Sequence, residues 1–186
     1  MRIISGELRG RKLLSPDSNK VRPTTDKVKE AVFNILAPYL EDAVVVDLFA
    51  GTGSLGLEAL SRGAVRVYFV DKSKESINLV KENVKHCAAE DRSVIIFSDF
   101  ERGLEHIPEK VDIIFLDPPY SKGFMEKSLS LISGSGRLNE EGIVVAEHGR
   151  DEILPERIGN LTMIKEKKYG KIMISIYSYG SEGNLA

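Results

Sequence analysis

The sequence predicts an α/β fold in which a mostly parallel sheet carries helices on both faces. Three observations predict this fold: short apolar runs alternate with segments of helical periodicity, a glycine-rich loop follows the first long run, and 186 residues suit one domain with a sizeable core. Strands separated by helices indicate βαβ units, and these units build parallel sheets.

The chain begins with a loosely alternating segment, residues 1–13, that we predict to be a short hairpin. A helix is predicted next. It begins near Pro23 and Thr24 or Thr25 and ends at Pro38, because the apolar residues between these points recur at helical spacing.

The rest of the chain alternates between the two kinds of element. Five apolar runs are predicted as strands: residues 43–49, 65–71, 93–99, 111–117 and 141–148. Helices are predicted between them: residues 54–63, 73–87, 101–107 and 122–132. Residues 161–179 are predicted as two strands around Gly170.

The composition is typical of a globular protein, with 42% hydrophobic and 29% charged residues. Because Cys87 is the single cysteine, we expect a reducing, cytoplasmic location. No apolar run is long enough to span a bilayer, so no membrane partner is expected. The three histidines lie far apart in the sequence, and we expect no metal site.

Charge is distributed unevenly along the chain. Residues 1–30 hold eight basic and four acidic side chains, a net charge of +4, which leaves −6 for the rest. A basic segment on an acidic body suits contact with a polyanion, although an ordinary solvated segment is the alternative. We therefore interpret residues 1–186 as one domain with a basic N-terminal arm, residues 1–40, and a core, residues 41–186.

Four consecutive predicted strands end in an acid: Asp47, Asp71, Asp99 and Asp117. Ligands of parallel α/β sheets bind beyond the carboxyl ends of the strands, so these acids are expected at the binding edge. The loop after the first strand has the glycine spacing of a nucleotide-binding turn, which lets the backbone approach a ligand closely: Gly51, Gly53 and Gly56.

The acids predict how a cofactor is held. Asp71, about 20 residues after the loop, can accept hydrogen bonds from both ribose hydroxyls of an adenosine. Asp99 either accepts from an adenine amine, with Phe100 beside the ring, or caps the next helix. Phe49 borders the loop and is included in the cofactor site. Asp47 would repel a pyrophosphate and attract a cation, which favours S-adenosylmethionine over NAD.

The fourth predicted strand runs into "DPPY", residues 117–120, where proline prevents further strand pairing. This motif offers the Asp117 carboxylate and the Pro118 carbonyl, the latter restrained by Pro119, as hydrogen-bond acceptors. Tyr120 adds an aromatic face. An exocyclic amine of a nucleobase can donate to both acceptors while its ring stacks on the tyrosine, so we predict that these residues hold the target base.

These motifs resemble a known family. "DLFAGTGSLGLEAL" with "DPPY" resembles Rossmann-like S-adenosylmethionine-dependent methyltransferases of exocyclic amines, and "RPTTDKVKEAVFNIL" and "MRIISGELRGRKL" are similar to the RsmD-type bacterial 16S rRNA guanine-N2 methyltransferases. The resemblance covers nearly the whole chain. It implies a seven-stranded sheet whose last strand is antiparallel, a cofactor pocket that includes Gly51, Gly53, Asp71 and Asp99, and a guanine of small-subunit rRNA as substrate.

The arm is expected to contact the RNA. Arg9, Arg11 and Lys12 are predicted to bind its backbone. Arg22, Thr24 and Thr25 precede a helix whose positive end can meet a phosphate or a flipped nucleotide, or they simply cap that helix. The expected partner is 16S rRNA, within a 30S subunit or an assembly intermediate, and the protein is expected to be a monomer.

Three alternatives stay open at this point. The motifs permit a DNA adenine-N6 or cytosine-N4 methyltransferase, although the chain leaves no room for a separate recognition domain. An NAD-binding oxidoreductase would leave "DPPY" without a role. A non-catalytic RNA-binding module would leave the acids at the strand ends without a role.

Overall fold

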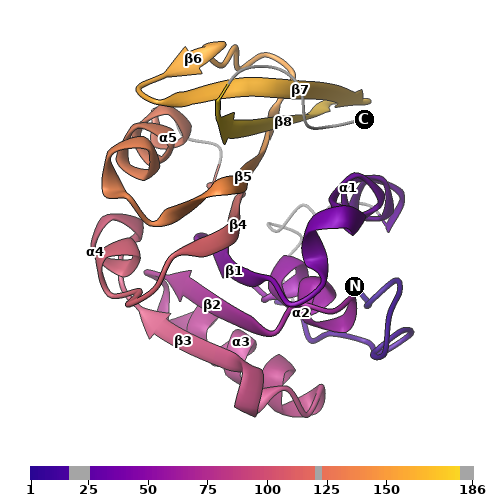
Figure 1. Ribbon diagram of the computed structural model, residues 1–186. Helices are drawn as coiled ribbons and strands as arrows, with labels where there is room; N and C mark the ends of the chain where they lie inside the picture. The colour runs from indigo at the N-terminus through magenta and orange to yellow at the C-terminus, as the bar shows by residue number, and fades with distance from the viewer. Residues whose placement is uncertain (17–25, 120–122, 181–186) are drawn as a thin grey trace.

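The computed structural model describes residues 1–16, 26–119 and 123–180, which form one sheet with helices on both faces (Figure 1). The strands are β1 (Val44–Asp47), β2 (Arg66–Asp71), β3 (Ser93–Phe97), β4 (Val111–Leu116), β5 (Leu138–Gly149), β6 (Arg157–Ile158), β7 (Leu161–Tyr169) and β8 (Ile172–Tyr179). The helices are α1 (Asp26–Leu40), α2 (Ser54–Ser61), α3 (Lys74–His86), α4 (Phe100–Glu105) and α5 (Phe124–Ser135), with a 3-10 turn at Glu90–Arg92.

The strand order is β3-β2-β1-β4-β5-β8-β7-β6. Strands β1 to β5 pair in parallel, whereas β8 is antiparallel to both β5 and β7. The predicted mostly parallel sheet with an antiparallel last strand is therefore confirmed. The described sheet has eight strands instead of seven, because the two-residue β6 pairs with the start of β7.

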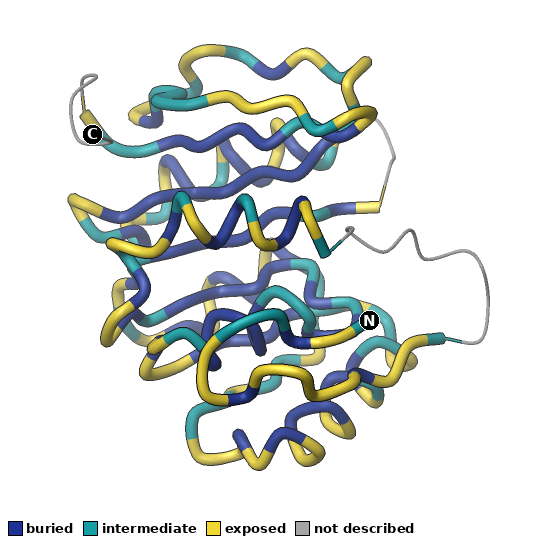
Figure 2. Tube along the Cα trace, turned by 90° about the vertical axis from the view of Figure 1, so that its right-hand side faces the viewer, coloured by how far each residue is buried: buried dark blue, intermediate teal, exposed yellow. Residues whose placement is uncertain are grey.

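Side chains alternate between two apolar layers. On β4, Ile113 and Phe115 join the layer that holds α1, α2 and α3, while Ile114 and Leu116 join the layer that holds α4 and α5. The central strands are accordingly buried along most of their length (Figure 2). Helix α1 is anchored by Phe33, whose ring centroid lies 5.5 Å from that of Phe115.

The predicted end of the first helix is wrong by two residues. Helix α1 continues through Pro38 to Leu40, and its predicted start lies outside the described residues. Pro38 has no N–H to donate to the carbonyl four residues earlier, so the last turn of the helix forms with one hydrogen bond fewer. Leu40 is buried in the apolar layer, which favours continuing the helix to that point.

The predicted hairpin of residues 1–13 forms only a single antiparallel bridge, between Arg2 and Lys12. This segment packs on α2. The backbone amides of Ile4 and Ser5 donate to the buried Glu58 carboxylate at 2.8 and 3.0 Å. Three backbone hydrogen bonds join the two arms of this hairpin, and the contacts with Glu58 fix the amino end of the arm against the core.

A buried cation strengthens this attachment. Lys29 of α1 is 1% exposed and lies 3.3 Å from Oε2 of Glu58. Its Nζ also donates to the Arg2 carbonyl at 2.6 Å and to Ser54 Oγ at 3.2 Å. Burial lowers the pKa of Lys29, and the charge of Glu58 opposes this effect. One ammonium group thus joins the arm, α1 and the start of α2.

Candidate active site

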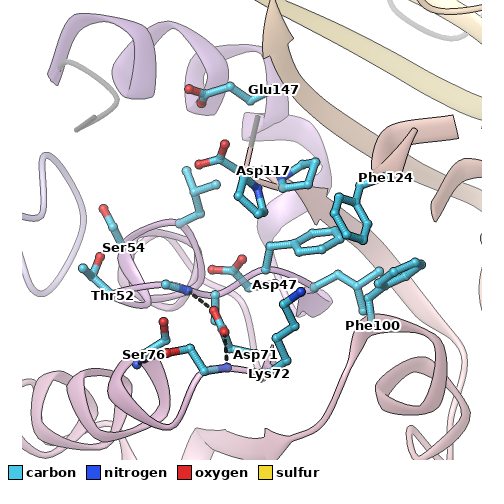
Figure 3. A pocket seen from close by; sticks show the side chains of 18 of the residues that line it. Asp47, Thr52, Ser54, Asp71, Lys72, Ser76, Phe100, Asp117, Phe124 and Glu147 are labelled. Carbon is cyan, nitrogen blue, oxygen red and sulfur yellow. Dashed lines mark hydrogen bonds between the residues drawn. The ribbon is translucent and has the colours of Figure 1, made fainter. Parts of the chain in front are cut away.

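A cavity of about 470 Å³ opens at the carboxyl ends of β1, β2, β4 and β5. Its walls come from the loops that follow these strands, from residues at the start of α2, α3 and α4, and from Met1 (Figure 3). This is the edge at which parallel α/β sheets bind their ligands.

The glycine loop between β1 and α2 forms one wall. Gly51 and Gly53 have φ values of 55° and 78°, in the left-handed region that glycine adopts without strain. Gly51 lines the cavity, and Gly53 is the N-cap of α2. Gly56 has a packing role, since an added Cβ would lie 2.3 Å from Phe69 Cε1. The loop therefore has the left-handed backbone that its glycine spacing predicts, and close approach to a ligand stays a prediction.

Asp71, at the end of β2, connects two loops of the cavity. Its Oδ2 accepts the Gly51 N–H at 2.9 Å, and its Oδ1 accepts the Ser73 N–H at 2.8 Å. A carboxylate has about four lone-pair sites, so each oxygen can take a further donor from a ligand. Asp71 is thus oriented by the backbone at the position where ribose contacts were predicted.

Asp47 lies beneath the glycine loop with its side chain almost completely buried. Its Oδ2 accepts the Gly56 N–H at 3.2 Å. Burial is the main cause that raises the pKa of Asp47 to about 7; the Gly56 hydrogen bond opposes the rise, and the charge of Asp71 adds a smaller contribution to it. A buried carboxylate at the floor of a cavity favours a cationic ligand over a pyrophosphate.

Asp117 follows β4 and lines the same cavity together with Pro118 and Pro119. Burial raises the pKa of Asp117 well above its usual range, and the charges of Glu147 and Asp47 add to this effect. The three carboxylates project from β1, β4 and β5 into one space (Figure 3). Sequence reasoning thus placed Asp117 correctly at the cavity.

Glu147 was missed by the sequence prediction. It lies near the carboxyl end of β5, lines the cavity, and is 8% exposed. A signal was present, because the strand-end rule that singled out four aspartates applies equally to the fifth predicted strand, which ends in "AEH". Lys72, Ser54 and Phe124 also line the cavity without having been predicted.

Aromatic side chains form the opposite wall. The ring centroids of Phe49 and Phe100 lie 5.5 Å apart, and those of Phe100 and Phe124 lie 6.0 Å apart in an edge-to-face arrangement. The Lys72 ammonium lies 5.2 Å from the centroid of Phe124. Phe49 and Phe100, both predicted cofactor contacts, therefore do line the cavity and give it an apolar, aromatic wall.

Asp99 caps the helix that follows it, which was one of the two roles that the sequence allowed. Its Oδ1 accepts the Arg102 N–H at 2.9 Å, so it caps α4. The neighbouring Ser98 lines the cavity, whereas Asp99 does not. The contact between Asp99 and an adenine amine stays a prediction.

The predicted RNA contacts are only partly described. Arg9 and Arg11 are both exposed, and Arg11 Nη1 donates to the His86 carbonyl at the end of α3 at 2.6 Å. Other predicted contacts lie outside the described residues: Arg22, Thr24, Thr25 and Tyr120. The arginines of residues 1–16 are therefore accessible, and two of them, Arg2 and Arg11, are also bonded to α1 and to the end of α3.

Across residues 1–16, 26–119 and 123–180, no helix combines the length and apolar character needed to cross a membrane. Within the same ranges, no three or more His, Cys, Asp or Glu side chains are grouped so as to hold a metal ion.

Comparison with known proteins relates the fold and cavity to named relatives. A Bacillus subtilis (strain 168) protein named "Putative rRNA methyltransferase YlbH" is 42% identical over 181 residues, which are 95% of this chain and 98% of that protein. Ribosomal RNA small subunit methyltransferase D of Escherichia coli K12 is 35% identical over 187 residues, covering 98% of this chain and 92% of the relative.

A solved structure is also similar to this chain. "Putative methyltransferase yhhF from Escherichia coli" matches with a TM-score of 0.86 and 34% identity, over 96% of this chain and 97% of that one. The fold and cavity are thus those of the Rossmann-like methyltransferase class. The family model described as "Conserved hypothetical protein 95" matches residues 1–178, and the chain belongs to this family. The predicted resemblance to RsmD-type methyltransferases is confirmed.

Proposed function

We propose that this protein transfers a methyl group from S-adenosylmethionine to the exocyclic N2 amine of a guanine in 16S rRNA, within a 30S subunit or an assembly intermediate. The observation that carries the proposal is the meeting of Asp117 and Pro118 with the glycine loop and Asp71 around one cavity. Two named relatives, covered over nearly their full length, are described as rRNA methyltransferases, which supports RNA as the substrate.

The residues of the cavity fit the cofactor. Its volume of about 470 Å³ lies within the usual range of small-molecule sites. Gly51 lets the backbone approach the ligand, Asp71 presents oxygens to ribose hydroxyls, and Phe49 and Phe100 offer an apolar surface to the adenine ring. The buried Asp47 carboxylate suits a ligand that carries an ammonium and a sulfonium group, and it disfavours the pyrophosphate of NAD.

When bound, S-adenosylmethionine supplies a methyl group already activated by a sulfonium leaving group. The task of the protein is then to orient and activate a poor nucleophile, because the lone pair of the guanine amine is delocalised into the ring. In the proposal, Asp117 and the Pro118 carbonyl accept the two N–H groups of the amine and fix its direction. Such positioning supplies up to roughly 7–11 kcal/mol in well-oriented reactions.

Asp117 has a second task in the proposal. As the new N–C bond forms, the nitrogen becomes cationic and its proton becomes acidic, and the nearby carboxylate stabilises that charge and accepts the proton, directly or through water. The raised pKa of Asp117 makes it a stronger base than an exposed aspartate. The proton is then released to solvent.

The test is to incubate the protein with labelled S-adenosylmethionine and unmodified 30S particles, and to map the methylated base. The proposal expects 2-methylguanine at one position. In the same assay, Asp117→Ala should lower kcat by about 10²- to 10⁴-fold with little change in S-adenosylhomocysteine affinity, while the exposed-residue control Asp151→Ala keeps full activity. Wild-type turnover in Asp117→Ala would remove this residue from the mechanism.

A further inference from the structure

Glu147 and Asp117 occupy equivalent places on neighbouring strands. In the parallel pairing of β4 with β5, Leu116 is opposite Ala146, so the next residues along each strand are Asp117 and Glu147. Neighbouring strands lie about 4.8 Å apart, which brings two carboxylates to one side of the cavity. Figure 3 shows both side chains directed into the same space.

Glu147 is buried, and Asp117 is partly exposed at the cavity that both residues line. Glu147 is 8% exposed, and its charge is the second cause, after burial, of the raised pKa of Asp117. Two neighbouring carboxylates disfavour each other's ionised form, and a ligand that donates a hydrogen bond to each of them stabilises both. A ligand with two adjacent N–H groups satisfies this requirement better than a ligand with one.

The nucleobases differ in this respect. Guanine presents an N1–H donor directly beside its N2 amine, so its edge offers adjacent donors. Adenine and cytosine each present a bare ring nitrogen, which is an acceptor, beside their exocyclic amine. A carboxylate is an acceptor only, and placing another acceptor against it in a buried site is costly because neither group gains a hydrogen bond from the other.

We propose that Glu147 selects guanine by accepting the N1–H of the target base while Asp117 and the Pro118 carbonyl hold the neighbouring amine. The inference rests on the proposed function and adds a specificity-determining residue to it. Adenine and cytosine are rejected because their ring nitrogen would face the buried Glu147 carboxylate, a repulsive contact that complements the attractive one.

The test compares guanine with one base that differs at N1 and with one that lacks the exocyclic amine. The position that the methylation mapping identifies is made guanine, 2-aminopurine or inosine in rRNA assembled into 30S particles. 2-Aminopurine keeps the amine and replaces N1–H with a bare nitrogen, whereas inosine keeps N1–H and lacks the amine. The kcat/KM ratio of guanine to 2-aminopurine is measured for the wild type, for Glu147→Gln, and for the control Glu141→Gln, which changes an exposed glutamate of the same strand.

The wild type should prefer guanine, and Glu147→Gln should reduce that preference by about 10- to 100-fold, the usual effect of losing a hydrogen bond to a charged group. Inosine particles should compete with guanine particles for the wild type and compete less well for Glu147→Gln. Glu141→Gln should match the wild type in both measurements. A purely structural role of Glu147 would lower activity on guanine and 2-aminopurine equally.

The outcomes separate the two proposals. An unchanged guanine to 2-aminopurine ratio in a folded Glu147→Gln protein overturns the role of Glu147 and leaves the methyltransferase proposal intact. Absence of methylguanine in the wild-type reaction overturns the proposed function itself. Should Glu147→Gln unfold, Glu147→Asp serves as the second variant. The aspartate keeps the negative charge but has a side chain one methylene shorter, so the carboxylate lies farther from the base. The guanine to 2-aminopurine ratio should therefore fall in this variant as well, and an unchanged ratio would again refute the inference.

Discussion

Replacing Asp47 with asparagine should stabilise the cofactor-free protein above neutral pH. The native state raises the pKa of this buried side chain from 3.8 to about 7, so folding disfavours its ionised form. Each pKa unit between the folded and unfolded states corresponds to 1.36 kcal/mol, which gives about 4 kcal/mol when Asp47 is fully ionised. The amide oxygen of asparagine can still accept the Gly56 N–H, so the main change is the loss of the charge.

The sign follows from proton binding. Between about pH 4 and pH 7 the folded state holds a proton on Asp47 that the unfolded state has lost, so the free energy of unfolding of the wild type falls as pH rises through this window. Below the window the group is protonated in both states, and above it the penalty is constant. Asp47→Asn should therefore equal the wild type near pH 4 and exceed it by about 4 kcal/mol at pH 8.

Urea unfolding of the cofactor-free protein at several pH values between 4.5 and 8 measures this difference. The matched control is Asp91→Asn, which changes an aspartate on the protein surface and should show a pH-independent difference near zero. A stability difference for Asp47→Asn that does not grow with pH would refute the reasoning. If Asp47 faces the ligand ammonium as the proposed function holds, the stabilised variant should also bind S-adenosylhomocysteine about 10- to 100-fold more weakly.

Three further changes test other parts of the structure. Lys29→Met should lower the free energy of unfolding by about 3 kcal/mol, because it removes a cation from the buried Glu58 carboxylate, and limited proteolysis should then cut residues 1–16 faster; equal cleavage rates would contradict this. Gly56→Ala should destabilise the protein by about 1–3 kcal/mol in thermal unfolding, since the added Cβ would lie 2.3 Å from an aromatic carbon of β2, and an unchanged Tm would argue against such tight packing. The double change Arg9→Ala and Arg11→Ala should weaken RNA binding and reduce the slope of log K against log salt by about one for each phosphate that the arm no longer binds; an unaltered slope would exclude the arm from the interface.

Much of the site was predictable because parallel sheets place strand ends at one edge. Buried apolar runs ending in acids located Asp47, Asp71 and Asp117, and the structure brings all three to one cavity. Glycine spacing predicted the loop for a second reason: tight strand–helix turns require left-handed backbone, which glycine adopts without strain. These signals are local in sequence and depend little on the rest of the fold.

Other features depend on tertiary contacts that periodicity does not report. Lys29 looks like a surface residue of an amphipathic helix, yet its burial depends on Glu58 and on the Arg2 carbonyl. The hairpin of residues 1–13 keeps backbone hydrogen bonds between its two arms, and two of its amides also bond to the Glu58 carboxylate of α2. Asp99 had two plausible partners in the sequence, and only the folded structure shows that it caps α4.

The position of β8 bears on how this protein folds during synthesis. β8 follows β7 in the chain and yet inserts between β5 and β7, so both neighbours expose unpaired backbone until it arrives. A nascent chain emerging from the ribosome therefore cannot complete its sheet before nearly all of the described sequence has been translated. We therefore expect chaperones to protect the incomplete sheet during that interval. We also expect folding to be strongly sensitive to frameshifts or stop codons within residues 172–179.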